Sequence, residues 1–199
     1  MINCIIFDIG NVLIDFKPIE YLKNLFPREE DILVLHKLIF GSIEWLKLDR
    51  GIITLQEAIE ILSNKNPQQK DKIKRCLEAW VEILTPIEEV VEILKKLDLE
   101  KYKLLLLSNF HDYAYNHIVD KYEFFQLFHG GIISCNEKLL KPEEEIYLCL
   151  IQKYNIKPEE AIFIDDTVEN IHQAQRLGFS TIRFENPKQL QAELKSYLD

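Results

Sequence analysis

Residues 5–12 read Ile5-Ile6-Phe7-Asp8-Ile9-Gly10-Asn11-Val12, and this stretch decides the fold. The apolar run predicts a buried strand, which ends at a carboxylate followed by residues that are common in turns. Ligands of parallel α/β sheets bind just beyond the carboxyl ends of the strands, so we expect Asp8 in a crevice there. Asp8 is therefore the candidate nucleophile, although the same residues also suit an ordinary turn.

Five short apolar runs predict strands, and amphipathic helical segments separate the later ones. The strands are expected at about residues 2–7, 103–107, 130–133, 161–164 and 181–184. Capping sequences or prolines mark the expected helix starts, namely Thr85-Pro86-Ile87-Glu88, Pro142, Thr167 and Asn186-Pro187. This alternation predicts βαβ units, and so an α/β protein with a doubly wound parallel sheet.

The segment from about Phe16 to Leu84 breaks the alternation, because it reads as helices only. Within it, Thr54-Leu55-Gln56-Glu57 is a capping box and Asn66-Pro67 begins a further helix. We expect an α-helical cap over residues 16–84, inserted into a core of residues 1–15 and 85–199. The cap would lie over Asp8, unless these helices serve only the core.

Bulk composition limits the class of partner. The chain has 199 residues, of which 47% are hydrophobic, so it can bury a sizeable core. The net charge of −9 gives no attraction to nucleic acid or to an anionic membrane. No apolar run is long enough to span a bilayer, no secretory segment precedes Asp8, and the four cysteines form no CxxC pair, so we expect a cytoplasmic protein.

Three further strand ends carry polar groups of matching chemistry. Ser108-Asn109 follows one strand, and a hydroxyl beside free backbone N–H groups suits a phosphate oxygen. Lys141 precedes a helix, where its ammonium could neutralise both a carboxylate and a phosphoryl group. Asp165-Asp166 ends another strand, and such hard oxygen ligands suit Mg²⁺. Each feature alone also fits a cap, a turn or a solvated side chain.

Taken in order, these residues resemble the four motifs of the haloacid dehalogenase-like superfamily. The motifs are Asp8 within FDIGNV, Ser108, Lys141, and Asp165-Asp166 with Asn170. The resemblance covers the whole chain, since a helical cap between the first two motifs is typical of one large subgroup. The DxGN form of the first motif also looks like that of sugar-1-phosphate phosphatases. The segment from Trp45 to Thr54 looks like the caps of bacterial sugar-phosphate phosphatases and of the phosphatase domain of soluble epoxide hydrolases.

The resemblance implies a Mg²⁺-dependent phosphatase that acts on a small phosphorylated metabolite, expected to be a sugar phosphate, through an aspartyl-phosphate on Asp8. Trp45, Lys47 and Arg50 are candidates for substrate choice, and the oligomeric state is open. The implied site comprises Asp8 and Lys141 for catalysis, Ser108, Asn109 and Lys141 for phosphate, and Asp8, the Gly10 carbonyl, Asp165 and Asp166 for the metal.

Gly10 departs from the superfamily pattern, because most of its phosphatases carry a second Asp there as the general acid and base. Asp15 is one substitute, and a readily leaving sugar hemiacetal would need an acid less. Two alternatives stay open: a 2-haloacid dehalogenase that needs no metal, and a non-catalytic phosphate-binding or partner-binding protein. The Asp165-Asp166 pair favours the metal-dependent phosphatase.

Overall fold

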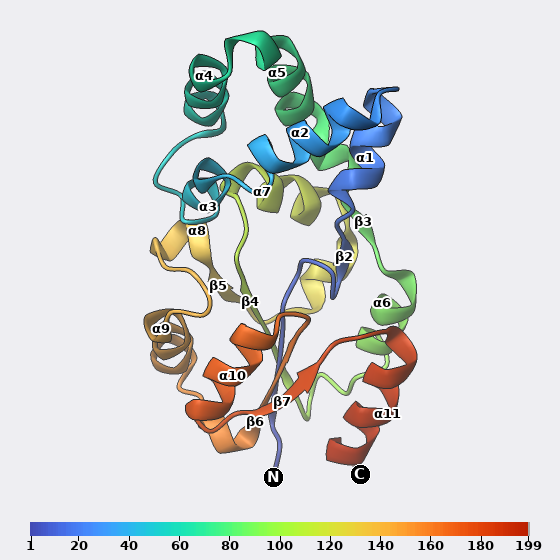
Figure 1. Cartoon of the computed structure of the whole chain (residues 1–199). Coiled ribbons are helices and arrows are strands. Elements are labelled where there is room, and N and C mark those ends of the chain that lie inside the picture. The colour runs from blue at the N-terminus through green and yellow to red at the C-terminus, as the bar shows by residue number, and fades with distance from the viewer. Residues whose placement is uncertain (199) are drawn as a thin grey trace.

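The structure is a computed structural model, and it describes residues 1–198. Five parallel strands form one sheet in the order β5–β4–β1–β6–β7, with β1 at the centre (Figure 1). The strands are β1 (Cys4–Phe7), β4 (Lys103–Ser108), β5 (Gly131–Ile133), β6 (Ala161–Asp165) and β7 (Ser180–Arg183). All five strands expected from the sequence are present, and each bound is within two residues of the expected one.

Helices cover both faces of the sheet because its central strands are apolar on both sides. Ile5 and Phe7 belong to one core, which packs against α6 (Glu88–Leu94), α7 (Asp112–Lys121) and α11 (Pro187–Leu198). Ile6 belongs to a second core with α9 (Glu144–Tyr154) and α10 (Val168–Arg176). Neighbouring residues of a strand point to opposite faces, which explains the division. The predicted doubly wound α/β sheet is confirmed.

A layer of helices lies beyond the carboxyl ends of the strands (Figure 1). In the chain, these helices follow β2 (Ile14–Asp15) and precede β3 (Thr85–Pro86). Residues 16–84 contain no strand, as the sequence predicted. Because β2 and β3 pair antiparallel, the chain enters and leaves this layer at one place. The bounds of a separate cap domain stay a prediction, and we call these helices the cap helices. They are α1 (Pro18–Leu25), α2 (Glu29–Ile39), α3 (Ile43–Asp49), α4 (Leu55–Lys65) and α5 (Lys70–Ala79), with 3-10 turns at Pro67–Gln69 and Trp80–Ile83.

The capping box at the start of α4 is confirmed. The Thr54 hydroxyl accepts a hydrogen bond from the Glu57 N–H at 3.2 Å, and the Glu57 carboxylate accepts one from the Thr54 N–H at 2.7 Å. Asn186 likewise caps α11 by accepting a hydrogen bond from the Gln189 N–H at 3.0 Å. Among residues 1–198, no helix has the length and apolar character that a membrane crossing requires.

Two other expected helix starts are wrong. Thr85 and Pro86 form β3 opposite β2, so Thr85 is not a cap and α6 begins at Glu88. The pairing with β2 holds Pro86 in a strand, whereas the first residue of a helix must have helical backbone angles. Pro142 follows a cis peptide bond and lies before α9, which begins at Glu144.

Candidate active site

Asp8, Ser108 and Asp165 lie at the carboxyl ends of three neighbouring strands. β1 pairs with β4 on one side and with β6 on the other, and the Asp8 N–H donates to the Ile164 carbonyl of β6 at 2.9 Å. The chain adds β4 and β5 on one side of β1 before it adds β6 and β7 on the other. Ligands of open α/β sheets bind at such a reversal of strand order.

Lys141 connects the carboxylates of two of these strand ends. Its Nζ lies 2.9 Å from Asp8 Oδ1 and 2.6 Å from Asp165 Oδ2, and it donates to the Leu107 carbonyl at 2.9 Å. Burial disfavours the charged ammonium, but Asp165 and Asp8 outweigh that effect and raise the pKa of Lys141. Lys141 therefore remains a cation and fixes the position of Asp8.

The Asp8 carboxyl combines burial with one uncommitted oxygen. Burial raises the pKa of Asp8 to about 7, against the lowering effect of Lys141 and with a further increase from Asp165. The Ile9 N–H donates to Asp8 Oδ1 at 2.7 Å, and Lys141 contacts the same oxygen. Apart from the Ser108 hydroxyl, whose geometry is not that of a normal hydrogen bond, no group within residues 1–198 bonds the other carboxyl oxygen, Oδ2.

Asp8, Asp165 and Asp166 form a cluster in which each offers one oxygen within 4.8 Å of the others. Burial raises the pKa of Asp166, and the charge of Asp165 raises it further. Asn11 Nδ2 donates to Asp166 Oδ2 at 3.3 Å, and Asn170 Nδ2 donates to both oxygens of Asp165 at 3.0 and 3.1 Å. Three carboxylates thus face one ammonium, and this excess of negative charge suits a divalent cation.

Ser108 and Asn109 have different surroundings. Ser108 is 1% exposed, and its hydroxyl helps to lower the pKa of Asp8 but makes no hydrogen bond of normal geometry within the described chain. A buried hydroxyl of this kind is stabilised when a ligand or water pairs with it. Asn109 Oδ1 accepts from the Lys141 N–H at 2.8 Å, and its Nδ2 donates to the Lys141 carbonyl at 3.0 Å. Asn109 therefore holds the backbone of Lys141 in place.

Gly10 leaves open the space where a longer side chain would lie. A Cβ added at this position would meet no atom within 4 Å. Lack of space therefore does not explain why position 10 has no acidic side chain. Asp15, the candidate substitute for the acid, pairs with Lys17 at 2.5 Å in the β2–β3 region, and its role as an acid stays a prediction.

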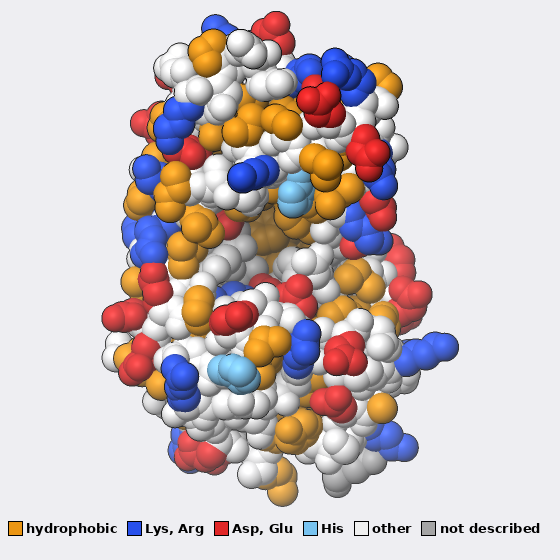
Figure 2. Space-filling model, viewed as in Figure 1, with side chains coloured by type: hydrophobic (Ala, Val, Ile, Leu, Met, Phe, Trp, Pro, Cys, Tyr) orange, Lys and Arg blue, Asp and Glu red, His pale blue; other side chains and the backbone are white. Residues whose placement is uncertain are grey.

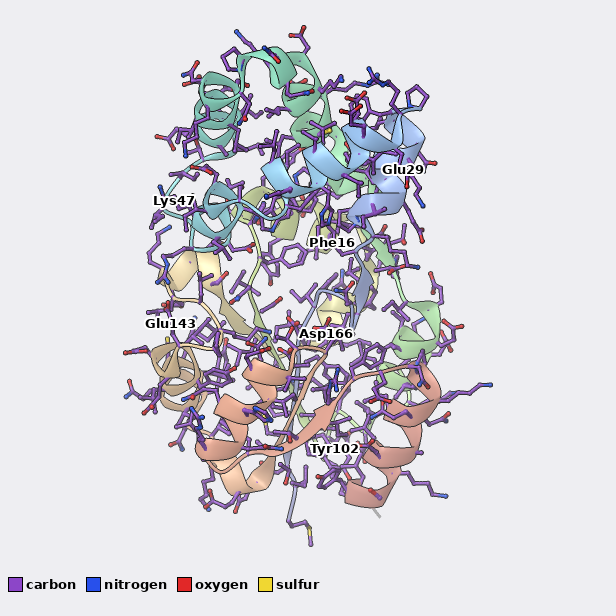
Figure 3. The ribbon with its side chains drawn as sticks, viewed as in Figure 1. Phe16, Glu29, Lys47, Tyr102, Glu143 and Asp166 are labelled. Atoms are coloured by element: carbon purple, nitrogen blue, oxygen red, sulfur yellow. The ribbon has the colours of Figure 1, made fainter. Side chains whose placement is uncertain are left out.

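A hollow lies between the cap helices and the sheet edge, with hydrophobic side chains along its upper wall and acidic ones at its lower edge (Figure 2). Phe16 and Asp166 approach it from opposite sides (Figure 3). Nine residues line a pocket of about 80 Å³ there, which we call the ring pocket. They are Gly10, Phe16, Trp45, Asp49, Trp80, Leu84, Asn109, Phe110 and His111.

Of the three cap residues expected to set substrate choice, only Trp45 lines the ring pocket. Arg50 instead makes two hydrogen bonds to the Glu143 carboxylate and donates to the Lys138 carbonyl at 3.0 Å. Lys47 is not among the lining residues. Arg50 therefore ties the end of α3 to the loop that carries Lys141.

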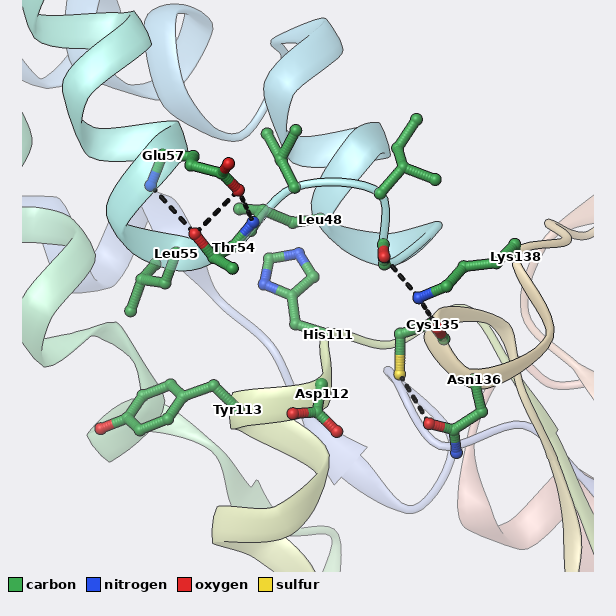
Figure 4. Close-up of a pocket in the computed structure, with 13 residues that line it drawn as sticks. Leu48, Thr54, Leu55, Glu57, His111, Asp112, Tyr113, Cys135, Asn136 and Lys138 are labelled. Atoms are coloured by element: carbon green, nitrogen blue, oxygen red, sulfur yellow. Dashed lines mark hydrogen bonds between the residues drawn. The ribbon is translucent and has the colours of Figure 1, made fainter.

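A larger cavity of about 550 Å³ lies between α3 and α4 on one side and α7 and α8 (Ser134–Glu137) on the other (Figure 4). Several of its polar side chains are already paired: Thr54 with Glu57, and Lys138 with the carbonyls of Gly51 and Cys135. None of the three clustered carboxylates lines it. The carboxylate cluster therefore lies outside this cavity, at the sheet edge.

Sequence reasoning missed three residues of the site. Asn11 has a positive φ of 53° and bonds Asp166; an Asn directly after Gly10 was a usable signal, since Asn tolerates this conformation. His111 lies close behind Ser108-Asn109 and could have been included as a polar residue near a strand end. Trp80 follows the helical apolar pattern of its segment, so nothing in the sequence distinguished it from a core residue.

Comparison with known proteins gives consistent matches. A family model for haloacid dehalogenase-like hydrolases matches residues 2–178. D-ribitol-5-phosphate phosphatase from Bacteroides thetaiotaomicron is 25% identical, and the match covers 100% of both chains. Flavin mononucleotide hydrolase 1 from Arabidopsis thaliana is 26% identical over 75% of this chain, which spans 60% of that protein. This chain also resembles a solved structure of a HAD family enzyme from Bacteroides thetaiotaomicron, in complex with magnesium and inorganic phosphate. The TM-score is 0.72 at 27% identity, and the match covers 93% of this chain and 95% of that chain.

Proposed function

The chain belongs to the haloacid dehalogenase-like hydrolase family, and on that premise we propose that it is a Mg²⁺-dependent phosphatase of small phosphate monoesters. One observation carries the proposal: Lys141 bridges Asp8 and Asp165, while Asp8, Asp165 and Asp166 gather within 4.8 Å. A carboxylate held by an ammonium inside a divalent-cation site is equipped to attack phosphorus.

The donor set fits Mg²⁺. We assign Asp8, the Gly10 carbonyl and Asp166 as its ligands, with Asp165 as a further ligand or as the partner that fixes Lys141. The raised pKa values of Asp8 and Asp166 mark carboxylates that lack sufficient positive charge around them. When bound, the metal supplies positive charge to the phosphoryl oxygens and to these carboxylates.

In the proposed reaction, Asp8 Oδ2 attacks phosphorus in line with the ester oxygen. The bond from Asp8 to phosphorus forms, the ester P–O bond breaks, and the leaving oxygen takes a proton from water. The Ser108 hydroxyl and the Lys141 ammonium neutralise the phosphoryl oxygens. A water molecule then attacks phosphorus, which releases inorganic phosphate and restores the Asp8 carboxylate.

The resemblance of the sequence favours a sugar phosphate as the substrate, and relatives support small phosphate esters more broadly. The relatives named above act on ribitol phosphate and flavin mononucleotide, so the likeness does not select one leaving group. That choice depends on the ring pocket and is taken up below.

Asp8→Asn tests the proposal. The amide keeps the shape of the side chain but is a poor nucleophile, so Mg²⁺-dependent phosphate release from p-nitrophenyl phosphate and from D-ribitol 5-phosphate should fall about a thousandfold or more. Asp120→Asn, which changes an exposed carboxylate on α7, is the matched control and should release phosphate at the unaltered rate.

Three outcomes would redirect the assignment. Undiminished metal-dependent turnover by Asp8→Asn would refute the role of Asp8. Halide release from 2-haloacids that survives EDTA would favour the dehalogenase alternative. Tight binding of phosphate with no hydrolysis of any ester would favour the non-catalytic one.

A further inference from the structure

The ring pocket is walled by aromatic side chains that hold one another in place. The Trp45 ring centroid lies 4.3 Å from that of His111, 4.9 Å from Trp80 and 4.8 Å from Phe40. Phe16 stacks on Trp45 at 5.8 Å with an angle of 18° between the planes. Packing of this kind makes a preformed surface for a flat apolar group.

The pocket offers few uncommitted hydrogen-bonding groups. Both amide atoms of Asn109 bond the backbone of Lys141. Asp49 Oδ1 lies 3.1 Å from His111 Nε2, in a direction that does not make a hydrogen bond. A molecule with several hydroxyls would therefore place most of them against rings, and each unpaired hydroxyl costs free energy.

Two ring nitrogens of the wall are buried and make no hydrogen bond within the described residues. Trp80 is 3% exposed and His111 is 4% exposed. Within residues 1–198, neither Trp80 Nε1 nor His111 Nε2 has a hydrogen-bond partner. Buried polar groups are almost always paired in native proteins, and an indole N–H can only donate. Because almost none of the surface of either nitrogen is accessible, the wall presents mainly ring carbons to an occupant of the pocket.

We infer that the leaving group of the substrate is a single flat, largely apolar ring rather than a polyol. This inference rests on the proposed phosphatase function. The volume of about 80 Å³ is well below the roughly 300–1,000 Å³ of pockets for drug-sized ligands, which favours a leaving group as small as one ring. Asp8 does not line the pocket, but Gly10 and Asn109 do, so the pocket adjoins the turn that follows Asp8 and the end of β4.

Three phosphate esters of primary alcohols test the inference, because their leaving oxygens have similar intrinsic reactivity. They are benzyl phosphate, cyclohexylmethyl phosphate and D-ribitol 5-phosphate, assayed with Mg²⁺ and the whole chain. We expect kcat/KM for benzyl phosphate to exceed that for the ribitol ester about tenfold or more, and that for the cyclohexyl ester severalfold, since only the flat ring stacks. Equal or higher kcat/KM for the ribitol ester would overturn the inference and leave the phosphatase proposal intact. If no ester releases phosphate, the proposed function itself fails.

Trp45→Ala should lower the ratio of kcat/KM between benzyl phosphate and D-ribitol 5-phosphate about tenfold. Leu46→Ala is the control, because Leu46 is exposed on the same helix and does not line the ring pocket; its ratio should match that of the unaltered chain. An unchanged ratio in Trp45→Ala would contradict the inference.

Because Trp45 also packs the cap helices, a second readout uses the unaltered chain. The two tryptophans of the sequence, Trp45 and Trp80, both line the ring pocket, so tryptophan fluorescence reports on it. Benzylphosphonate, which is not hydrolysed, should change the emission in a saturable way, and methylphosphonate should change it far less. Equal responses to the two phosphonates, or no response to either, would overturn the inference.

Discussion

At the scale of single residues, the site is a balance between crowded carboxylates and one buried ammonium. Lys141 neutralises part of the charge of Asp8 and Asp165, but the pKa of Asp8 is still raised to about 7. Such a site holds a proton in place of a cation when no metal is bound. Proton binding and metal binding should therefore be linked.

The apparent affinity for Mg²⁺ should rise with pH up to about 7 and then level off. Below that pH the metal must displace a proton from Asp8, which weakens binding about tenfold per pH unit. Isothermal titration calorimetry in buffers of different ionisation enthalpy measures both the affinity and the proton released. An affinity that is independent of pH between 5 and 7 would contradict the raised pKa.

The same pKa predicts how the metal-free chain responds to pH. Asp8 binds its proton more tightly in the folded state than in the unfolded chain, where carboxyl pKa values are near 4. Its contribution to stability is thus present at low pH and is lost as pH rises from about 4 to about 7. Relative to Asp8→Asn, the Tm of the metal-free chain should fall across this window. Parallel Tm curves for the two chains would refute the linkage.

Gly10→Asp should restore the acid that the superfamily pattern places there. A side chain has room at this position, and general acid catalysis contributes about 10²–10⁴ to a rate, so kcat for an alkyl phosphate should rise about tenfold or more. The gain should be smaller for p-nitrophenyl phosphate, whose leaving group needs no proton. Gly10→Ala is the steric control and should leave both rates within about threefold. Equal losses on both substrates in Gly10→Asp would show that position 10 cannot hold the acid.

At the scale of elements, periodicity and caps predicted most of the sheet and helices, and tertiary pairing explains the failures. The Thr54 capping box formed because α4 begins in a cap loop with no competing partner. The same sequence pattern at Thr85 did not form a helix cap, because the backbone there pairs with β2. Lys138, which no motif of the sequence singled out, has a left-handed backbone and donates to the Gly51 carbonyl of the cap segment. No local pattern encodes those partners.

Contacts between α3 and the loop that carries Lys141 should influence turnover. Arg50 bonds Glu143, whose carboxylate also accepts from the Leu140 N–H at 3.0 Å, so the cap segment and the catalytic loop share one ion pair. Arg50→Ala should lower kcat/KM about tenfold. Lys47→Ala, on the same helix, is the control and should have little effect. An Arg50→Ala enzyme with unaltered kcat/KM would show that this contact only joins the two parts of the fold.

At the scale of the whole molecule, the strand order brings the predicted site together. Asp8, Ser108 and Asp165 meet because β1 lies between β4 and β6 and all three strands run parallel, and Lys141 reaches them from the loop before α9. The sequence was sufficient to foresee this convergence, since each strand ended in a polar residue of matching chemistry. The ring pocket could not be foreseen, because Phe16, Trp45, Trp80 and His111 come from separate segments and meet only after the cap helices pack over the sheet edge.

Trapping the phosphorylated chain tests the central claim, nucleophilic attack by Asp8 on phosphorus, most directly. A single turnover with Mg²⁺ and an excess of a hydrolysable phosphate ester is quenched in acid, and the chain is mapped by mass spectrometry. We predict one phosphoryl group on the peptide that contains Asp8, and none in Asp8→Asn. A phosphoryl group on any other residue, or full turnover by Asp8→Asn, would contradict the account.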